Sequence, residues 1–161
     1  MELVLLRHAK AEECPPWISD EERNLTPKGR KKAQAAAKGL VKFLHDVDQL
    51  EIWSSHALRS VQTAQILAAN FGGMEVKEYR YIYTGRLEEV MKELRQMRAD
   101  AVVVVVGHEP HLGVWAKQLA GVTLPFKKCA AAGFKIDFEE ELNIKLEWFA
   151  SSKILAKLGE E

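Results

Sequence analysis

Cysteine is scarce in this sequence, and the two cysteines present form no recognisable binding pattern. Cys14 and Cys129 lie far apart and belong to no Cys-x-x-Cys or Cys/His spacing. This pattern argues against both a disulfide framework and a structural zinc site. We therefore expect two idle thiols in a protein of a reducing compartment.

An excess of one charge and a long apolar run are also missing. Lysine and arginine number 23, and aspartate and glutamate also number 23, so the formal charge is zero. A neutral chain has no general attraction to nucleic acid or to a membrane, so any anion site must be local. The apolar start at residues 3–6 lacks the basic region of a signal peptide, and no run approaches the roughly 20 residues of a membrane span. We expect a cytoplasmic protein.

Alternating strand and helix patterns run through most of the chain. The 161 residues, 47% of them apolar, suit one buried core, so we predict a single domain over residues 1–161. The predicted strands cover residues 3–6, 50–53, 75–78, 101–106, 131–138 and 143–150, and the predicted helices cover 27–44, 54–71, 87–97 and 110–120. This order predicts a three-layer α/β/α sandwich with a mainly parallel sheet and a C-terminal antiparallel edge.

Several local signals support these elements. Five consecutive valines in residues 102–106 favour a central strand that is buried on both faces. Thr26 and Pro27 form a typical helix start, and Ser54 and Ser55 are predicted to cap the next helix. Residues 9–25 lack periodicity and predict a long loop, which is often functional in a compact domain.

Arginine and histidine gather at the predicted carboxyl ends of strands. Arg7 and His8 end the first strand, Arg59 follows the second, and His108 follows the valine strand. The carboxyl ends of parallel strands meet at one edge of a sheet, where ligands bind. A cluster of these cationic groups repels itself unless an anion fills it, and guanidinium groups match the oxygens of phosphate. The pattern therefore indicates a phosphate site.

Four motifs occur in an order that resembles a known family. They are Leu6-Arg7-His8-Ala9, Leu25-Thr26-Pro27-Lys28-Gly29, Ser54-Ser55 through Arg59 to Gln62-Thr63-Ala64, and Gly107-His108-Glu109-Pro110. This arrangement resembles the histidine phosphatase superfamily, which has the phosphoglycerate mutase-like fold, and most nearly its short SixA-type phosphohistidine phosphatase branch.

The resemblance implies a role for each matched position. His8 would be the nucleophile that takes up the phosphoryl group, and Arg7, Arg59 and a protonated His108 would bind the phosphate oxygens. No metal or other cofactor is implied. Attack on phosphorus requires one ring nitrogen of His8 to be neutral, with the other fixed by a hydrogen bond.

Two features depart from the larger members of this family. Ala9 stands where a glycine is usual, which is tolerable if its φ is negative. The 49 positions from Arg59 to His108 are too few for both a helical cap and the α/β elements, so we expect an uncapped, open and shallow site. The general acid is also not evident, and the candidates are Glu12, Asp20, Glu78 and Glu109.

The remaining candidates have less specific signals. Arg23 could reach the phosphate or hold the loop. His56 and His111 are interpreted as rim residues, and His45 as a surface residue. Among the tryptophans, only Trp17 in the loop after His8 is a credible substrate contact. His108 and His111 could suggest a metal site, but Pro110 interrupts the helical spacing that such a site uses.

These observations support one leading function and leave alternatives open. The leading hypothesis is dephosphorylation of phosphohistidine on a partner protein, such as a phosphotransfer domain, because an uncapped site can admit a protein side chain. The labile P–N bond also needs less acid catalysis than an ester. Alternatives are a small-molecule phosphomonoesterase, a phosphoglycerate mutase-like enzyme, which needs a closed cavity, and a non-catalytic phosphate-binding module.

Overall fold

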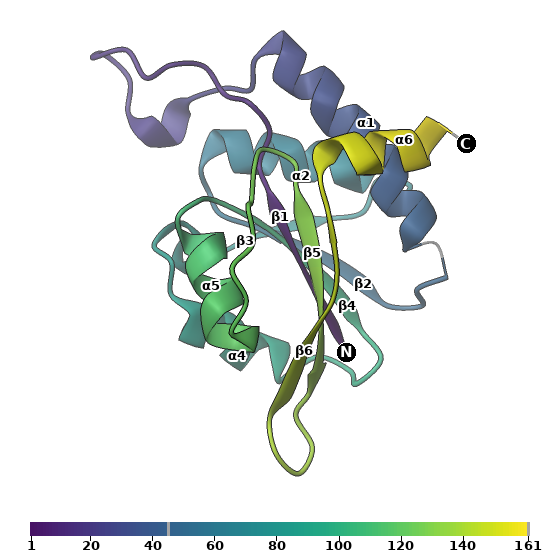
Figure 1. The fold of residues 1–161 in the computed structure, drawn as a ribbon. Coiled ribbons are helices and arrows are strands. Elements are labelled where there is room, and N and C mark those ends of the chain that lie inside the picture. Colours follow the sequence, from purple (N-terminus) through teal and green to yellow (C-terminus); the bar gives the residue numbers. More distant parts are fainter. Residues whose placement is uncertain (45, 161) are drawn as a thin grey trace.

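The computed structural model describes residues 1–44 and 46–160, which contain a six-stranded sheet in the order β3-β2-β4-β1-β5-β6 (Figure 1). The strands are β1 (Glu2–Arg7), β2 (Leu50–Ser54), β3 (Val76–Glu78), β4 (Val102–Gly107), β5 (Ala131–Asp137) and β6 (Asn143–Ala150). The helices are η1 (Asp20–Glu22), α1 (Pro27–Phe43), α2 (Leu58–Asn70), α3 (Arg80–Tyr83), α4 (Leu87–Leu94), α5 (His111–Ala120) and α6 (Ser152–Glu160). His45 lies outside the described residues.

The sheet has the mixed topology that the sequence predicts. β3, β2, β4 and β1 pair in parallel, and the valine strand β4 lies between β2 and β1. β5 pairs antiparallel with β1, and β6 pairs antiparallel with β5. The parallel core with a C-terminal antiparallel edge is therefore confirmed.

Alternate residues of the central strands contribute to two separate cores. Val4 and Leu6 of β1 lie in one core with α1, α2 and α6, whereas Leu3 and Leu5 lie in the other with α3, α4 and α5. The valines of β4 divide between the two cores in the same way. Because both faces are covered, these strands need apolar residues at every position, which explains their continuous apolar sequence. The predicted three-layer sandwich is confirmed.

The start of α1 follows the predicted capping chemistry. The Thr26 hydroxyl accepts a hydrogen bond from the backbone N–H of Gly29 at 2.9 Å, and Pro27 occupies the first helical position. Ala33, Ala36 and Leu40 form part of the buried side of this helix. The expected amphipathic helix is confirmed.

Other predicted boundaries were wrong. Ser54 and Ser55 do not cap α2, which begins at Leu58 after Ala57 without a side-chain capping bond. The helix predicted to reach residue 97 ends at Leu94, where the backbone tightens into i→i−3 hydrogen bonds. The short α3 and the terminal α6 were not predicted.

Helix α6 packs directly against α1 (Figure 1). At the contact, Gly39 of α1 lies so close to α6 that an added Cβ would be 1.9 Å from the carbonyl oxygen of Leu155. Leu155 is buried in the same core as Leu40. The close approach of the two helices therefore requires glycine at position 39.

The described chain from Arg59 to His108 forms the rest of α2, then β3, α3, α4 and β4. These elements belong to the sheet and its covering helices, so this segment adds no helical cap above the sheet. No helix within residues 1–44 and 46–160 is both long and apolar enough to cross a membrane.

We expect Gly39→Ala to destabilise the protein. The backbone of α6 must move away from the new methyl group, and such overpacking costs about 1–3 kcal/mol, against about 1 kcal/mol of improved helix propensity. Urea unfolding should show a net loss of up to about 2 kcal/mol. The exposed Lys31→Ala on the same helix should stay within about 0.5 kcal/mol of the native protein. Equal stability of the two variants would contradict the tight contact.

Candidate active site

His8 lies at the carboxyl end of β1 and is held by its backbone and its ring. Its backbone N–H donates to the carbonyl oxygen of Gly107 at 3.1 Å, and its side chain is buried. The ring Nδ1 lies 2.7 Å from the carbonyl oxygen of Ala9. A carbonyl oxygen only accepts hydrogen bonds, so Nδ1 carries the hydrogen and Nε2 keeps its lone pair. Nε2 is therefore the nitrogen available for nucleophilic attack.

The surroundings of His8 keep its ring neutral. Burial lowers the pKa of His8 to about 4, although the hydrogen bond to Ala9 acts in the opposite direction. The positive charges of Arg59, Arg7 and Arg23 also contribute to this low pKa. The structure thus brings three arginines into electrostatic range of His8, and at neutral pH the ring is an uncharged base.

His108 follows β4 and lies beside His8, with 5.0 Å between the ring centroids. Its Nε2 lies 2.5 Å from the hydroxyl oxygen of Ser55, which also accepts from the backbone N–H of Ala57 at 3.3 Å. If the Ser55 hydroxyl donates its hydrogen to Nε2, the hydrogen of a neutral His108 is on Nδ1. Ser55 was predicted only as a helix cap, and its serine-rich motif carried no signal for this contact.

The protonated state of His108 is expected during phosphoryl transfer and stays a prediction, whereas the ring in this structure is neutral. Burial and, to a smaller extent, the nearby His8 and Arg59 lower the pKa of His108 to about 3. The negative charge of Asp20 raises the pKa of His108, but by less than the other effects lower it. His108 is therefore neutral at neutral pH.

Three buried nitrogen atoms in this cluster have no hydrogen-bond partner among the described residues. They are Nε of Arg7, Nε of Arg59 and Nδ1 of His108. Arg7 is oriented by a 2.9 Å bond from Nη1 to the carbonyl oxygen of Phe126, and Arg59 by a 2.8 Å bond from Nη1 to that of Asp20. Buried donors without partners are costly. Such atoms are candidates for binding an oxyanion such as phosphate.

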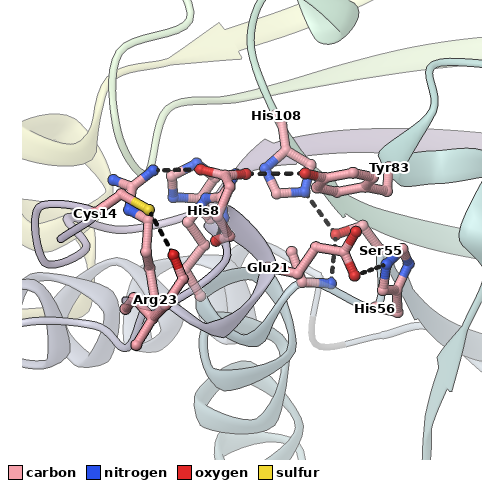
Figure 2. Close-up of polar contacts among 12 residues, drawn as sticks. His8, Cys14, Glu21, Arg23, Ser55, His56, Tyr83 and His108 are labelled. Atoms are coloured by element: carbon pink, nitrogen blue, oxygen red, sulfur yellow. Dashed lines mark hydrogen bonds and ion pairs between the residues drawn. The ribbon is translucent and has the colours of Figure 1, made fainter. Parts of the chain in front are cut away.

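Asp20 supplies the negative charge of the cluster. Its carboxylate accepts hydrogen bonds from Arg59 Nη2 at 3.0 Å, Arg23 Nη1 at 2.9 Å and the Tyr83 hydroxyl at 2.9 Å. Figure 2 shows Arg23 and Tyr83 on opposite sides of the space beside His8 and His108. Desolvation alone would raise the pKa of Asp20, but the bonds from Arg23 and Tyr83 and the charge of Arg59 lower it to about 2. The carboxylate occupies donors that a phosphoryl group would use.

Tyr83 is a member of this site that the sequence did not reveal. It ends α3, and its ring meets that of His108 edge to face at 5.5 Å. No motif surrounds it in the sequence, so its place depends on how α3 folds back beside β4.

Arg23 combines the two roles considered for it. It holds the loop, because its Nε donates to the carbonyl oxygen of Glu12 at 2.7 Å, and it pairs with Asp20. Its charge also acts on His8. Arg23 is therefore near enough to contribute to anion binding.

The other candidate acids lie in different settings from Asp20. Glu109 accepts a hydrogen bond from the backbone N–H of Gly113 at 2.6 Å, near the start of α5. Glu12 accepts from the backbone N–H of Asn24 within the loop, and Glu78 is exposed at the end of β3. Of the four, Asp20 has direct bonds to the arginine and tyrosine beside the two histidines.

The two remaining histidines lie at the edge of the cluster. His56 Nε2 is 2.9 Å from a carboxylate oxygen of Glu21, and its ring packs on Tyr83 at 4.9 Å (Figure 2). His111 begins α5, and its charge contributes to the low pKa of His108. Within the described part of the chain, no group of three or more histidine, cysteine or acidic side chains could hold a metal ion.

The side chains of the site are less exposed than we expected for a protein without a helical cap. His8, Arg59 and His108 are only 5–6% exposed. The segment from residue 9 to residue 26, which contains η1, lies beyond the carboxyl end of β1 and brings Asp20 onto Arg59 (Figure 1). This loop therefore covers part of the site, which is less open than the missing helical cap suggested.

The position after His8 accommodates alanine. Among non-glycine residues in the described chain, only Cys129 has a positive φ, so Ala9 is not in the left-handed region. Its backbone N–H donates to the Thr63 hydroxyl at 3.1 Å, which ties the His8 turn to α2.

Comparison with known proteins identifies similar chains over nearly the whole length. Residues 3–82 match the model of the histidine phosphatase superfamily (branch 1). An uncharacterised protein of Picosynechococcus is 34% identical over 143 residues, which cover 84% of this chain and 85% of that protein. A crystal structure assigned as the phosphohistidine phosphatase SixA of Agrobacterium tumefaciens is 25% identical, with a TM-score of 0.77 over 93% of this chain and 97% of that chain.

A third structure shares the fold at lower identity. It is a mycobacterial glucosyl-3-phosphoglycerate phosphatase in complex with inorganic phosphate, which is 19% identical. The TM-score is 0.73, over 95% of this chain and 99% of that chain.

We expect the buried histidines to make the protein less stable in mild acid. Their pKa values in the folded state, about 4 for His8 and about 3 for His108, lie below the usual value of 6.5. Between these values the unfolded chain binds more protons than the folded one, so the free energy of unfolding falls as the pH falls. From about pH 7 to about pH 4.5, His8 alone should cost about 2–3 kcal/mol.

Urea unfolding at the two pH values measures this loss. His108→Gln should reduce it, because one of the two buried histidines no longer titrates. A native protein equally stable at both pH values would contradict the neutral, buried state of the rings.

Proposed function

This chain belongs to the histidine phosphatase superfamily, in its SixA-type branch, and we propose that it removes the phosphoryl group from phosphohistidine on a partner protein. The family makes the chain a phosphatase that acts on a phosphorylated substrate. The proposed substrate is a phosphotransfer protein of the cytoplasm. The observation that carries it is the neutral ring of His8, with Nε2 unprotonated among three arginines.

His8 acts as the nucleophile in the first step. Its Nε2 attacks phosphorus, a new P–N bond forms, and the bond from phosphorus to the substrate imidazole breaks. The departing imidazole nitrogen keeps the bonding electron pair and takes up a proton. In the second step a water oxygen attacks phosphorus, the bond to His8 breaks, and phosphate leaves with the protons of the water.

The phosphoryl oxygens are bound by the groups that surround His8. Arg7 and Arg59 contribute Nε donors, and His108 contributes Nδ1–H. These donors are fixed by neighbouring bonds before substrate arrives, so little reorganisation is needed as charge shifts to the oxygens. The arriving phosphoryl group also displaces the Asp20 carboxylate from Arg59.

Asp20 is the best placed proton donor among the four candidates. Its low pKa in the unliganded protein follows from its bonds to Arg23 and Tyr83 and from the charge of Arg59. A phosphoryl dianion competes for the same cations and adds negative charge nearby, and both effects raise the pKa of a neighbouring carboxyl group. Asp20 can then carry a proton and give it to the leaving group.

The cover of the site suits a phosphorylated side chain of another protein. Phosphoryl access requires displacement of only the Asp20 carboxylate from Arg59, while the loop of residues 9–26 stays in place. Phosphohistidine also needs little acid catalysis, in agreement with a donor that is mostly ionised before binding. A mutase must retain its intermediate in a closed cavity, which this loop alone does not build.

We expect His8→Ala to abolish phosphatase activity. The native protein, incubated with a phosphorylated histidine phosphotransfer domain, should release phosphate and form an acid-labile, base-stable phosphoenzyme. Loss of the nucleophile should lower the rate by more than about 10³-fold, within the range for residues that act as one unit. His56→Ala, at the rim, should keep most of the activity.

The proposal fails if native protein releases no phosphate from the phosphotransfer domain, or if His8→Ala releases it equally. Hydrolysis of small phosphate esters alone would favour a small-molecule phosphatase. If neither the phosphotransfer domain nor small esters give a phosphoenzyme, a non-catalytic phosphate-binding module is favoured.

We expect Asp20→Asn to separate phosphate binding from proton transfer. Removing the competing carboxylate should tighten vanadate inhibition by about 1.5–5-fold, the usual range of exposed ion pairs. Hydrolysis of an alkyl phosphate should fall by about 100-fold, because its alkoxide needs a proton, whereas p-nitrophenyl phosphate should be little affected.

Glu78→Gln is the matched control, since it removes another candidate acid, and it should change neither quantity. Equal loss of activity on both esters in Asp20→Asn would show that Asp20 is not the proton donor.

A further inference from the structure

A groove that none of the roles above uses lies on the loop covering the active site. It has a volume of about 570 Å³, and its apolar lining comprises Pro15, Trp17, Ile18 and Leu58. The Trp17 side chain is 82% exposed, far more than the other tryptophans. An exposed indole on a projecting loop is a typical contact for another molecule.

The rim of this groove is acidic. Glu12, Glu13 and Glu22 line it together with Asn24, and the described lining contains no lysine or arginine. Two of the carboxylates are held in place, Glu12 by the backbone N–H of Asn24 and Glu22 by the Ser19 hydroxyl. The groove therefore combines apolar surface with fixed negative charge.

The groove adjoins the cationic cluster through consecutive residues of the chain. Leu58 of the groove precedes Arg59, and Glu22 precedes Arg23. Both arginines bond to Asp20 in the active site. Asp20 of η1 thus lies at the anion site, while Glu22 of the same helix lines the acidic groove.

We propose that this groove binds the polypeptide segment next to the phosphorylated residue of the substrate, and that it favours segments carrying a cationic and an apolar side chain. The inference rests on the proposed function, because it requires a protein substrate. Charge determines which segment fits: the phosphoryl group pairs with the arginines, and a basic side chain of the same segment pairs with the groove carboxylates.

Each contact has a known physical basis. An arginine of the substrate can lie over the Trp17 ring as a cation–π pair while its charge meets Glu13 or Glu22. A neighbouring apolar side chain can pack on Pro15 and Ile18. An acidic segment would meet like charges and be disfavoured.

Two matched phosphohistidine peptides test the preference. One has arginine and leucine beside the phosphohistidine, and in the other glutamate replaces arginine. Native protein should hydrolyse the first with kcat/KM about tenfold above the second, the sum of one cation–π pair and one or two exposed ion pairs. Trp17→Ala and Glu13→Gln should each reduce this ratio about threefold.

Two controls isolate the groove. Both variants should hydrolyse p-nitrophenyl phosphate as fast as the native protein, because this ester does not reach the groove. Glu141→Gln, in the exposed turn between β5 and β6 at the other end of the molecule (Figure 1), should leave the peptide preference unchanged.

The outcomes separate failure of this inference from failure of the proposed function. Hydrolysis of both peptides at equal kcat/KM overturns the inference and leaves the proposed function intact. If only p-nitrophenyl phosphate is hydrolysed, the proposed function fails. Binding of peptides to the groove is then measured by NMR. The Trp17 indole N–H resonance, assigned with Trp17→Phe, should shift with the unphosphorylated arginine peptide and not with the glutamate peptide; no shift with either overturns the inference.

Discussion

The parallel pairing of β1 with β4 is the interaction on which the active site depends. It sets Arg7 opposite Gly107, and the backbone N–H of His8 continues the ladder by donating to Gly107. The two histidines, 100 positions apart in the sequence, therefore leave the sheet side by side. Because β2 pairs with the other edge of β4, it delivers Ser55 to His108 and Arg59 to the same space.

The concentration of positive charge at this sheet edge explains the loop that follows β1. Three guanidinium groups act on His8, and Asp20 bonds to two of them. The loop that covers the site thus also neutralises it. In the proposed reaction, binding exchanges one anion for another, so entry of the phosphoryl group and displacement of the Asp20 carboxylate are a single event.

Burial and charge together determine the state of the two histidines. Both rings lose the stabilisation that water gives to a cation, and the arginines add repulsion. His8 is consequently neutral, with the Ala9 carbonyl selecting its tautomer, and Ser55 forms a hydrogen bond with Nε2 of His108. The same features that prepare one ring for attack and the other for donation destabilise the fold in acid, a stability cost at a functional site.

Local sequence patterns were sufficient to predict the layered fold, the central valine strand and the meeting of Arg7, His8, Arg59 and His108, because strand ends in a parallel sheet share one edge. They were insufficient for Tyr83, the Ser55 contact, the cover over the site and the packing of α6. Each of these depends on contacts between segments distant in the chain. The neutral state of His108 likewise follows from burial, which only the tertiary structure decides, because desolvation depends on everything packed around the ring.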